Sequence, residues 1–512
     1  MAQERPRKYS RLRLIRQIIM AGAVLVAAVL VFGPLWVRPV HEPTGLPYDQ
    51  LRNHAVYSEA YVPPHAPQRA LAVFVVCLAL WGTNLISLSS TALLALALLP
   101  ILGVTTVSQS FAYFGNSAVF FIVGVFVMAA AMIRTGLSKR LTLLLLHRFD
   151  RHPRLLVAGV VCSASFLAMW MPEHAVAAMM FPIVLEVAES LRLKQRQSGY
   201  AKMLFLGLAW GAIIGGVATF LGGARAPLAL ELLRDSFQDA EGRPVYNVSF
   251  LGWMKGSMPL VITLTALAVF ILFRFIKSEV DDISPATEML TQRVAELGPM
   301  SGPERRLAFV AVVTVGCWII LGHKTDLAII AILGAVGVSV LRIADWHEIQ
   351  EFINWGVVMM YGGAIALGSA MSDTHAVLWI ARAVLPDVHI HPAWLLLLMA
   401  ALTIVLSSAI SNAAAVAVLL PVGYGLCGQT DPAISPLAMT YAVGICSGLA
   451  FALPISSPPN AICFASRYYR MLDVPLYGVP LTLIAWGLFI IVSLLYWPLV
   501  GIDLTMTGAA TP

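Results

Sequence analysis

Charged residues are scarce in this sequence. Asp, Glu, Lys and Arg make up 12% of the 512 residues, whereas about a quarter of a soluble domain is charged. A soluble chain of this length would need more charge to cover the surfaces of two or three domains. The scarcity excludes a soluble enzyme, a nucleic-acid-binding protein and a disordered scaffold. Because 59% of the residues are hydrophobic and gather in runs as long as a membrane span, we predict an all-α polytopic membrane protein.

Catalytic and metal-binding motifs are also missing. The sequence contains no nucleophile elbow and no phosphate-binding loop. Its cysteines lie in apolar stretches without the spacing of a metal site, which predicts small buried side chains. These cysteines are Cys77, Cys162, Cys317, Cys427, Cys446 and Cys463. We therefore predict that the protein is not an enzyme and has no metal centre.

Glycine and proline, by contrast, are abundant for plain transmembrane helices, with 38 and 30 residues. They indicate broken helices and re-entrant hairpins. The segment 155–190 is too long for one span and too short for two, and its apolar run is interrupted by Pro172, Glu173 and His174. Basic residues flank both its ends, so we predict a hairpin that opens to the cytoplasm. A second hairpin, 392–428, is interrupted at Ser411-Asn412 and is predicted to open to the exterior.

The apolar runs predict about eleven transmembrane helices besides the two hairpins. Basic residues precede the first run, which lacks a small-residue cleavage site, so we predict an uncleaved span with a cytoplasmic N-terminus and an external C-terminus. Residues 138–154 are either an amphipathic helix on the cytoplasmic membrane surface or a basic loop. The predicted divisions are a basic segment, first span and external loop (1–69), a first repeat (70–276), a charged cytoplasmic linker (277–306), a second repeat (307–500) and an external tail (501–512).

The two halves of the chain share a pattern. Residues 172–182 and 411–421 each begin with a polar tip and end with a proline. Each hairpin is followed by a glycine-rich span with a break, at 222–227 in the first half and at 456–460 in the second. The odd number of intervening spans gives the two copies opposite orientations. Inverted repeats with broken helices near the membrane midplane are typical of secondary transporters, whose site lies where the breaks meet.

At these motifs the sequence resembles the divalent anion/sodium symporter family of the ion transporter superfamily. The resemblance extends over residues 70–500, and Ser411-Asn412 and the segment 452–462 carry it most clearly. It implies an elevator transporter in the inner membrane of the cell, usually a homodimer. It also implies transport of sulfate or of di- and tricarboxylates, with sodium bound near each hairpin tip. Some members of the family exchange anions without sodium.

The sequence departs from the family pattern mainly in its first half. Pro172-Glu173-His174 replaces the family's Ser-Asn-Thr at the first tip, and residues 223–226 replace Thr-Pro-Pro-Asn in the first break. At the second tip, Ala413 replaces Thr. We therefore expect no sodium site in the first half, and at most one Na⁺ near Asn412.

Ionised groups at membrane depth are costly and are candidates for function. Arg225 would supply a fixed positive charge and bind a carboxylate or sulfate. Glu173 would bind a cation or a proton, and His174 would couple protons to transport. The structural alternatives are a Glu173–Arg225 ion pair that only holds the hairpin, and helix capping for the Ser and Asn residues. The predicted substrate site comprises Glu173, His174, Arg225, Ser411, Asn412, Ser457 and Asn460.

These residues predict a secondary transporter of a small anion that works by exchange or proton coupling. Its predicted partners are the anionic substrate, membrane lipid and a second copy of the chain, and not nucleic acid. Two further hypotheses stay open. One is a cation/proton antiporter that uses Glu173 as its ion-binding carboxylate. The other is a receptor or assembly subunit that has the same fold and does not transport.

Overall fold

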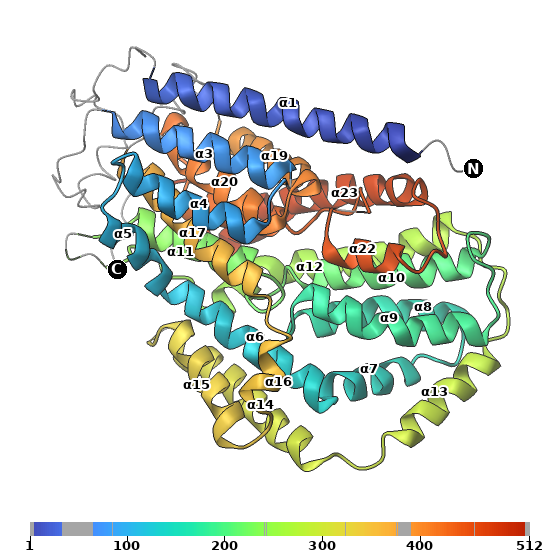
Figure 1. The fold of residues 1–512 in the computed structure, drawn as a ribbon. Helices are drawn as coiled ribbons and strands as arrows, with labels where there is room; N and C mark the ends of the chain where they lie inside the picture. Colours follow the sequence, from blue (N-terminus) through green and yellow to red (C-terminus); the bar gives the residue numbers. More distant parts are fainter. Residues whose placement is uncertain are drawn as a thin grey trace.

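The structure is a computed structural model that describes residues 5–32, 65–83, 85–239, 241, 243–322, 324–374, 376, 391–454 and 456–506. Within these ranges the chain is helical (Figure 1), and its extended pairings are two isolated bridges, Gln238–Pro244 and Ile434–Thr505. The predicted all-α class is therefore confirmed. Most of the predicted external loop before residue 65, the segment 377–390 and the end of the 501–512 tail lie outside the described residues.

The helices fall into groups along the chain. Before the first hairpin lie α1 (Arg5–Phe32), α3 (Ala66–Thr83), α4 (Leu88–Ile101), α5 (Val107–Ala112), α6 (Ser117–Thr135) and α7 (Leu137–His147). Next come α8 (Pro153–Ala168), α9 (Glu173–Ser190), α10 (Gly199–Gly215), α11 (Arg225–Ser236) and α12 (Phe250–Phe275). The middle of the chain forms α13 (Ser284–Glu296), α14 (Gly302–Leu321), α15 (Leu327–Val340), α16 (Trp346–Gln350) and α17 (Trp355–Asp373). The last group is α19 (Pro392–Ala409), α20 (Asn412–Leu426), α21 (Pro436–Cys446), α22 (Pro458–Phe464) and α23 (Asp473–Ile491).

Six helical segments among the described residues are long and apolar enough to cross a membrane. Shorter apolar helices, including α4, α8, α10, α15 and α20, accompany them. Such short helices suit half-spans and hairpin arms, since a full span needs about 20 residues. The chain is therefore a multi-pass membrane protein, and the count of about eleven spans stays a prediction.

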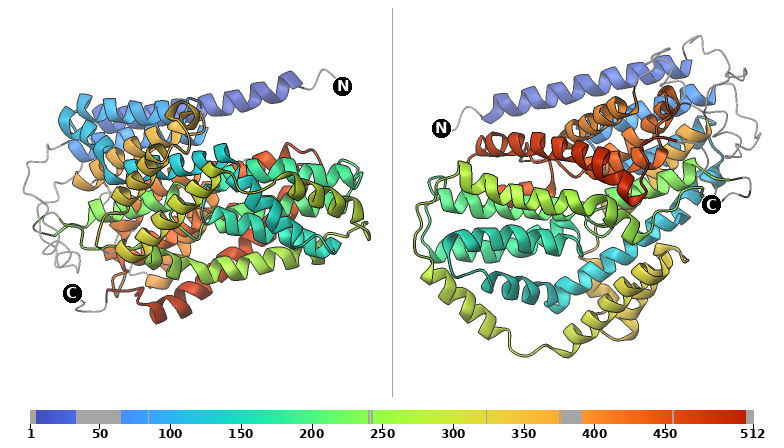
Figure 2. Two further views of the ribbon diagram at one scale, coloured as in Figure 1. Left: turned by 90° about the horizontal axis from the view of Figure 1, so that it is seen from below. Right: turned by 180° about the vertical axis from the view of Figure 1, so that it is seen from behind.

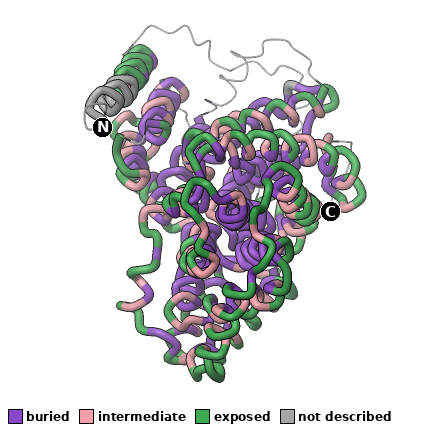
Figure 3. Tube along the Cα trace, turned by 90° about the vertical axis from the view of Figure 1, so that its right-hand side faces the viewer, coloured by how far each residue is buried: buried purple, intermediate pink, exposed green. Residues whose placement is uncertain are grey.

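The buried residues gather at the centre of the molecule (Figure 3). Nearly every residue of α10 is buried, because α8, α9, α12 and α22 pack around it. By contrast, α1 lies at one edge beside α3, and α13 to α15 lie towards the opposite edge (Figures 1 and 2). The helix α10 is thus enclosed by its neighbours, whereas α1 and α13 to α15 lie nearer the edges.

Two helix pairs turn at the polar interruptions seen in the sequence. In the first pair, α8 and α9 are joined by the short turn that contains Pro172, which stands directly before α9. In the second, α19 and α20 are joined at Ile410 and Ser411, and the Ser411 hydroxyl accepts a hydrogen bond from the backbone N–H of Ala414 at 3.2 Å. Proline suits the start of a helix because no N–H partner is needed there. Serine suits it because its hydroxyl bonds a backbone N–H that has no partner within the helix.

Each helix break exposes backbone carbonyls that must be bonded inside a membrane. Between α10 and α11, the Trp253 indole N–H donates to the carbonyl of Val217 at 3.1 Å, and the Ser257 hydroxyl donates to that of Ala218 at 2.9 Å. Between α21 and α22, the Asn460 amide donates to the carbonyls of Ala450 and Leu453. Both breaks are therefore held by side chains.

Two segments between the spans are helical. The basic stretch 138–154 begins within α7, whose buried face includes Leu143 and Leu146, so its first part is a helix rather than a loop. The charged linker 277–306 contains α13, where Arg293 forms an ion pair with Glu186 of α9 at 3.0 Å.

Close packing of α6 against α15 depends on Gly124. A Cβ atom at Gly124 would lie 2.7 Å from the carbonyl carbon of Ala331, so we expect Gly124→Ala to separate the helices and cost about 1–3 kcal/mol. Gly316→Ala on α14 is the matched control, because its Cβ would meet nothing within 4 Å. Thermal unfolding in detergent measures both. Equal melting temperatures for the two variants would contradict this account of the packing.

Candidate functional site

A buried ion pair joins the first hairpin to the first broken helix. The Arg225 guanidinium donates from Nη1 to Oε2 of Glu173 at 3.0 Å, and the two side chains are 2% and 6% exposed. Glu173 is the first residue of α9 and Arg225 is the first residue of α11. The backbone N–H of Glu173 also donates to the carbonyl of Gly222 at 2.9 Å. The hairpin tip and the helix break therefore form one unit.

Small residues make room for this pair. A Cβ atom at Gly216 would lie 2.6 Å from Oε2 of Glu173, and one at Gly448 would lie 2.5 Å from Nε of Arg225. Gly448 follows α21 in the second half of the chain, so the guanidinium lies between the broken helices of both halves. Larger residues at either glycine would displace the charged groups.

The second hairpin tip meets the same carboxylate. Asn412, the first residue of α20, donates from Nδ2 to Oε1 of Glu173 at 3.4 Å. Each carboxylate oxygen of Glu173 thus accepts from a different half of the protein. The N-termini of α9, α11 and α20 converge at this point, and each contributes partial positive charge. Together with Arg225, they stabilise the negative charge of Glu173.

Polar atoms remain without partners in and near this site. Among the described residues, Nη2 of Arg225, Oδ1 of Asn412 and Oγ of Ser457 are buried and make no hydrogen bond. Leaving a buried polar atom unpaired costs about 1–3 kcal/mol. A ligand or water that bonds these atoms would recover that energy, so they are candidate contact points. Arg225 offers a donor, Asn412 offers an acceptor, and the Ser457 hydroxyl offers either.

Other predicted site residues have local roles. The Ser411 hydroxyl caps α20, and Asn460 bonds the break through the carbonyls of Ala450 and Leu453. His174 lies beside Glu173 but contacts Phe126 edge-on, with 6.4 Å between ring centroids. The structure therefore brings together Glu173, Arg225 and Asn412, whereas Asn460 bonds the second helix break.

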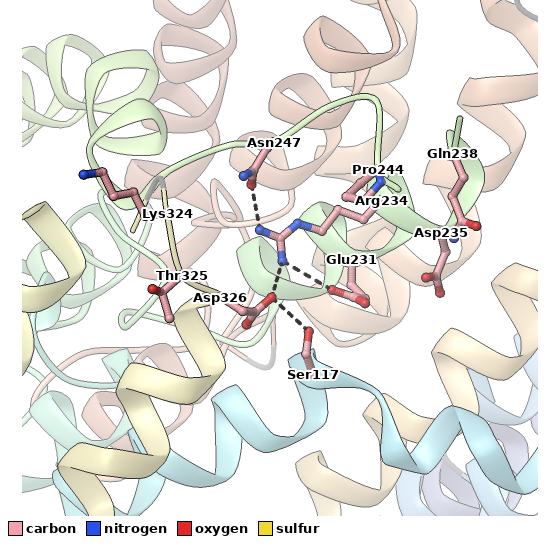
Figure 4. Close-up of a pocket in the computed structure, with 10 residues that line it drawn as sticks. All are labelled: Ser117, Glu231, Arg234, Asp235, Gln238, Pro244, Asn247, Lys324, Thr325 and Asp326. Carbon is pink, nitrogen blue, oxygen red and sulfur yellow. Dashed lines mark hydrogen bonds and ion pairs between the residues drawn. The ribbon is translucent and has the colours of Figure 1, made fainter. Parts of the chain in front are cut away.

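A second polar cluster lies at the opposite end of α11, where the sequence analysis named no candidate. Glu231, Arg234 and Asp235 line a cavity of about 300 Å³ with residues from the following loop and from the starts of α6 and α15 (Figure 4). The sequence does contain a signal for this cluster, because Glu231, Arg234 and Asp235 are three ionisable residues at helical spacing next to an apolar segment.

Comparison with known proteins identifies the family. The family described as the sodium:sulfate symporter transmembrane region matches residues 59–502. The chain belongs to this family. The resemblance to divalent anion/sodium symporters is therefore confirmed, and the protein is a membrane transporter rather than an enzyme.

Relatives within the sodium:sulfate symporter family are distant in sequence but cover most of the chain. A sodium-dependent dicarboxylate transporter of Staphylococcus saprophyticus is 27% identical over 468 residues, which is 85% of this chain and 88% of the relative. An uncharacterised transporter of Haemophilus influenzae is 26% identical and covers 83% of this chain and 91% of its own length.

Solved structures share the fold at low identity. MtrF of Neisseria gonorrhoeae, described among antimetabolite efflux pumps, aligns with a TM-score of 0.60 at 14% identity and covers 97% of both chains. The YdaH transporter of Alcanivorax borkumensis aligns with a TM-score of 0.51 at 14% identity, over 86% of this chain and 99% of its own. These likenesses concern the fold alone.

The buried pair predicts a non-additive effect on stability. Arg225→Met leaves Glu173 uncompensated, and we expect it to lower the free energy of unfolding by about 3–5 kcal/mol. The double variant Glu173→Gln/Arg225→Met removes both charges and is expected to lose much less. Unfolding titrations in mixed detergent measure the single and double variants. Additive losses would show that the two side chains contribute independently of each other.

Proposed function

We propose that this protein is a secondary active transporter that carries a small anion, sulfate or a di- or tricarboxylate, through the site around Arg225. Transport proceeds by an elevator mechanism, in a homodimer, and is driven by exchange or by protons with at most one sodium ion. The single observation that carries the proposal is the buried Arg225 guanidinium at the meeting point of three helix N-termini, whose Nη2 has no partner among the described residues.

Arg225 supplies the positive charge that the substrate needs. Two-pronged binding of a carboxylate or sulfate uses two nitrogens of a guanidinium. In the structure Nη1 is bonded to Glu173, and Nη2 is unpaired among the described residues. Substrate therefore binds first through Nη2. Protonation of Glu173, or its displacement by the substrate, then frees Nη1 for the second bond.

The second tip holds the sodium ion. Oδ1 of Asn412 is a buried acceptor without a partner among the described residues, and amide and backbone oxygens suit a hard cation. At the first tip, the Arg225 guanidinium already supplies a positive charge. The dependence on sodium of the staphylococcal relative supports coupling to this ion, and the asymmetry of the two tips supports a single ion.

The ion pair argues against the antiporter hypothesis. The Glu173 carboxylate is already paired with the Arg225 cation and also accepts from Asn412, so a transported cation would have to compete with Arg225 for it. The proposed role of Glu173 is instead to accept a proton and release Arg225.

In the elevator motion, α8 to α11 and α19 to α22 move as one unit past α3, α4, α6, α14, α15 and α17.

Flux measurements in liposomes test the role of Arg225. We expect purified wild-type protein to take up labelled sulfate, succinate or citrate, and Arg225→Gln to lower the initial rate at least about 100-fold because a buried charged contact is lost. Arg243→Gln is the matched control, since Arg243 is 71% exposed in a loop. Full uptake by Arg225→Gln would remove Arg225 from the site.

Sodium titration tests the number of coupling ions. We expect the initial rate to follow sodium concentration with a Hill slope no greater than about 1, because the first tip binds no sodium. Asn412→Ala is expected to weaken the remaining sodium response. The same uptake is measured over a range of sodium at fixed pH, with lithium and choline as replacement ions. A steep response that requires two or more ions would contradict the proposal.

A further inference from the structure

The second polar cluster, at the C-terminal end of α11, is built around Arg234 in the last turn of that helix. Its Nη1 lies 3.1 Å from Oδ2 of Asp326, and its Nη2 donates to Oδ1 of Asn247 at 2.8 Å (Figure 4). A more distant contact, at 3.9 Å, joins Nη1 to Glu231 on the same helix. The side chains of Arg234 and Asp326 are 14% and 34% exposed, so this ion pair is partly shielded from water.

The partner Asp326 belongs to a different part of the fold. It caps α15, because its Oδ1 accepts from the backbone N–H of Ala328 at 2.7 Å. Its Oδ2 also accepts from Ser117, the first residue of α6, at 3.4 Å. The two helices pack closely where Gly124 approaches Ala331. Asp326 is therefore fixed to the α6–α15 pair, whereas Arg234 is fixed to α11.

The helix α11 connects this pair to the proposed transport site. Arg225 and Arg234 are nine residues apart on it, which corresponds to about 14 Å along a helix. The helix is short and uninterrupted, so displacement of one end displaces the other. Holding Arg234 against Asp326 therefore also fixes where Arg225 lies relative to α6 and α15.

We propose that Arg234 and Asp326 form a latch that positions α11, and with it Arg225, and that opens once in every transport cycle. The inference rests on the proposed elevator motion, in which α11 moves and α6 and α15 do not. Arg234 is a positioning residue in this scheme, because it acts on substrate only through α11.

An ion pair suits this role better than the other contacts between the same elements. Phe121 of α6 packs edge-on against Phe220 in the first break, with 6.4 Å between ring centroids. Burial of apolar surface is non-directional, so it fixes the relative position of two helices less sharply than a charged hydrogen bond does. A charged hydrogen bond requires a defined distance and angle, so it holds one position and is lost when the helices shift.

A second contact joins the same end of α11 to the surrounding helices. Asp235 accepts from the Ser369 hydroxyl of α17 at 3.2 Å. Arg234 and Asp235 are adjacent and bond to two different neighbours, α15 and α17. The outer end of α11 is therefore held from two directions, which is the arrangement expected of a resting position.

Reversible cross-linking tests whether the latch must open. The variant Arg234→Cys/Asp326→Cys is made with Cys162 and Cys317 replaced by Ala, because the other four cysteines are buried. A short bis-methanethiosulfonate reagent joins the two thiols, and dithiothreitol releases them. We expect cross-linking to lower anion uptake in liposomes at least tenfold, and reduction to restore it.

The control pair is Asp239→Cys/Arg243→Cys, whose native side chains meet at 2.8 Å within the loop after α11. Cross-linking there does not join α11 to α15, so uptake should stay within twofold. Two results would overturn the latch. One is uptake by the cross-linked latch pair within twofold of its reduced form, and the other is failure of that pair to cross-link while the control pair does. If the wild-type protein carries no anion, the proposed function fails and the latch fails with it.

Charge removal gives an independent measurement. Asp326→Asn keeps an oxygen that can cap α15 and removes the charge. We expect Asp326→Asn, Arg234→Gln and the double variant each to raise the maximal uptake rate three- to tenfold with KM within twofold, because all three remove the same restraint. Asp239→Asn is the control. Multiplicative effects of the two single changes, or rates equal to the control, would refute the latch.

Discussion

The buried ion pair between Glu173 and Arg225 is the interaction on which the arrangement of the site depends. Two charges can be kept away from water only when each is closely paired, so the hairpin tip and the helix break cannot separate without a large cost. The pair also sets what surrounds it. Gly216 and Gly448 have no side chains because the charged groups fill that space, and Asn412 approaches the remaining carboxylate oxygen.

The two halves of the protein meet the same structural problem with different chemistry. Each contains a hairpin tip facing a broken helix, and each break leaves backbone carbonyls to be bonded. The first half provides fixed charges of both signs, Glu173 and Arg225. The second half provides neutral groups, with Asn460 bonding the break and Asn412 at the tip. Because of this asymmetry, the proposed function has the guanidinium of Arg225 as the cation at the first tip and a sodium ion at the second.

The helix α11 gives the site a mechanical connection to the rest of the fold. Its N-terminus carries the proposed substrate contact, and its C-terminus carries the contacts to Asp326 and Ser369. Because one short helix carries both, the energy of binding at one end can influence the position of the other. In the proposed latch, the polar C-terminal end of α11 therefore takes part in transport.

The sequence by itself determined the membrane class, the family, and the places where apolar runs are interrupted. These follow from local composition, since a charge or a proline in an apolar run is visible without knowledge of the fold. It also drew attention to Glu173 and Arg225 and named an ion pair between them as one alternative, but it did not point to the polar cluster around Arg234. Only the tertiary structure decided which groups meet. Glu173 reaches Arg225 across 52 residues and Asn412 across 239, while Asn460 turns to its own break, because packing between distant helices chooses a side chain's partner.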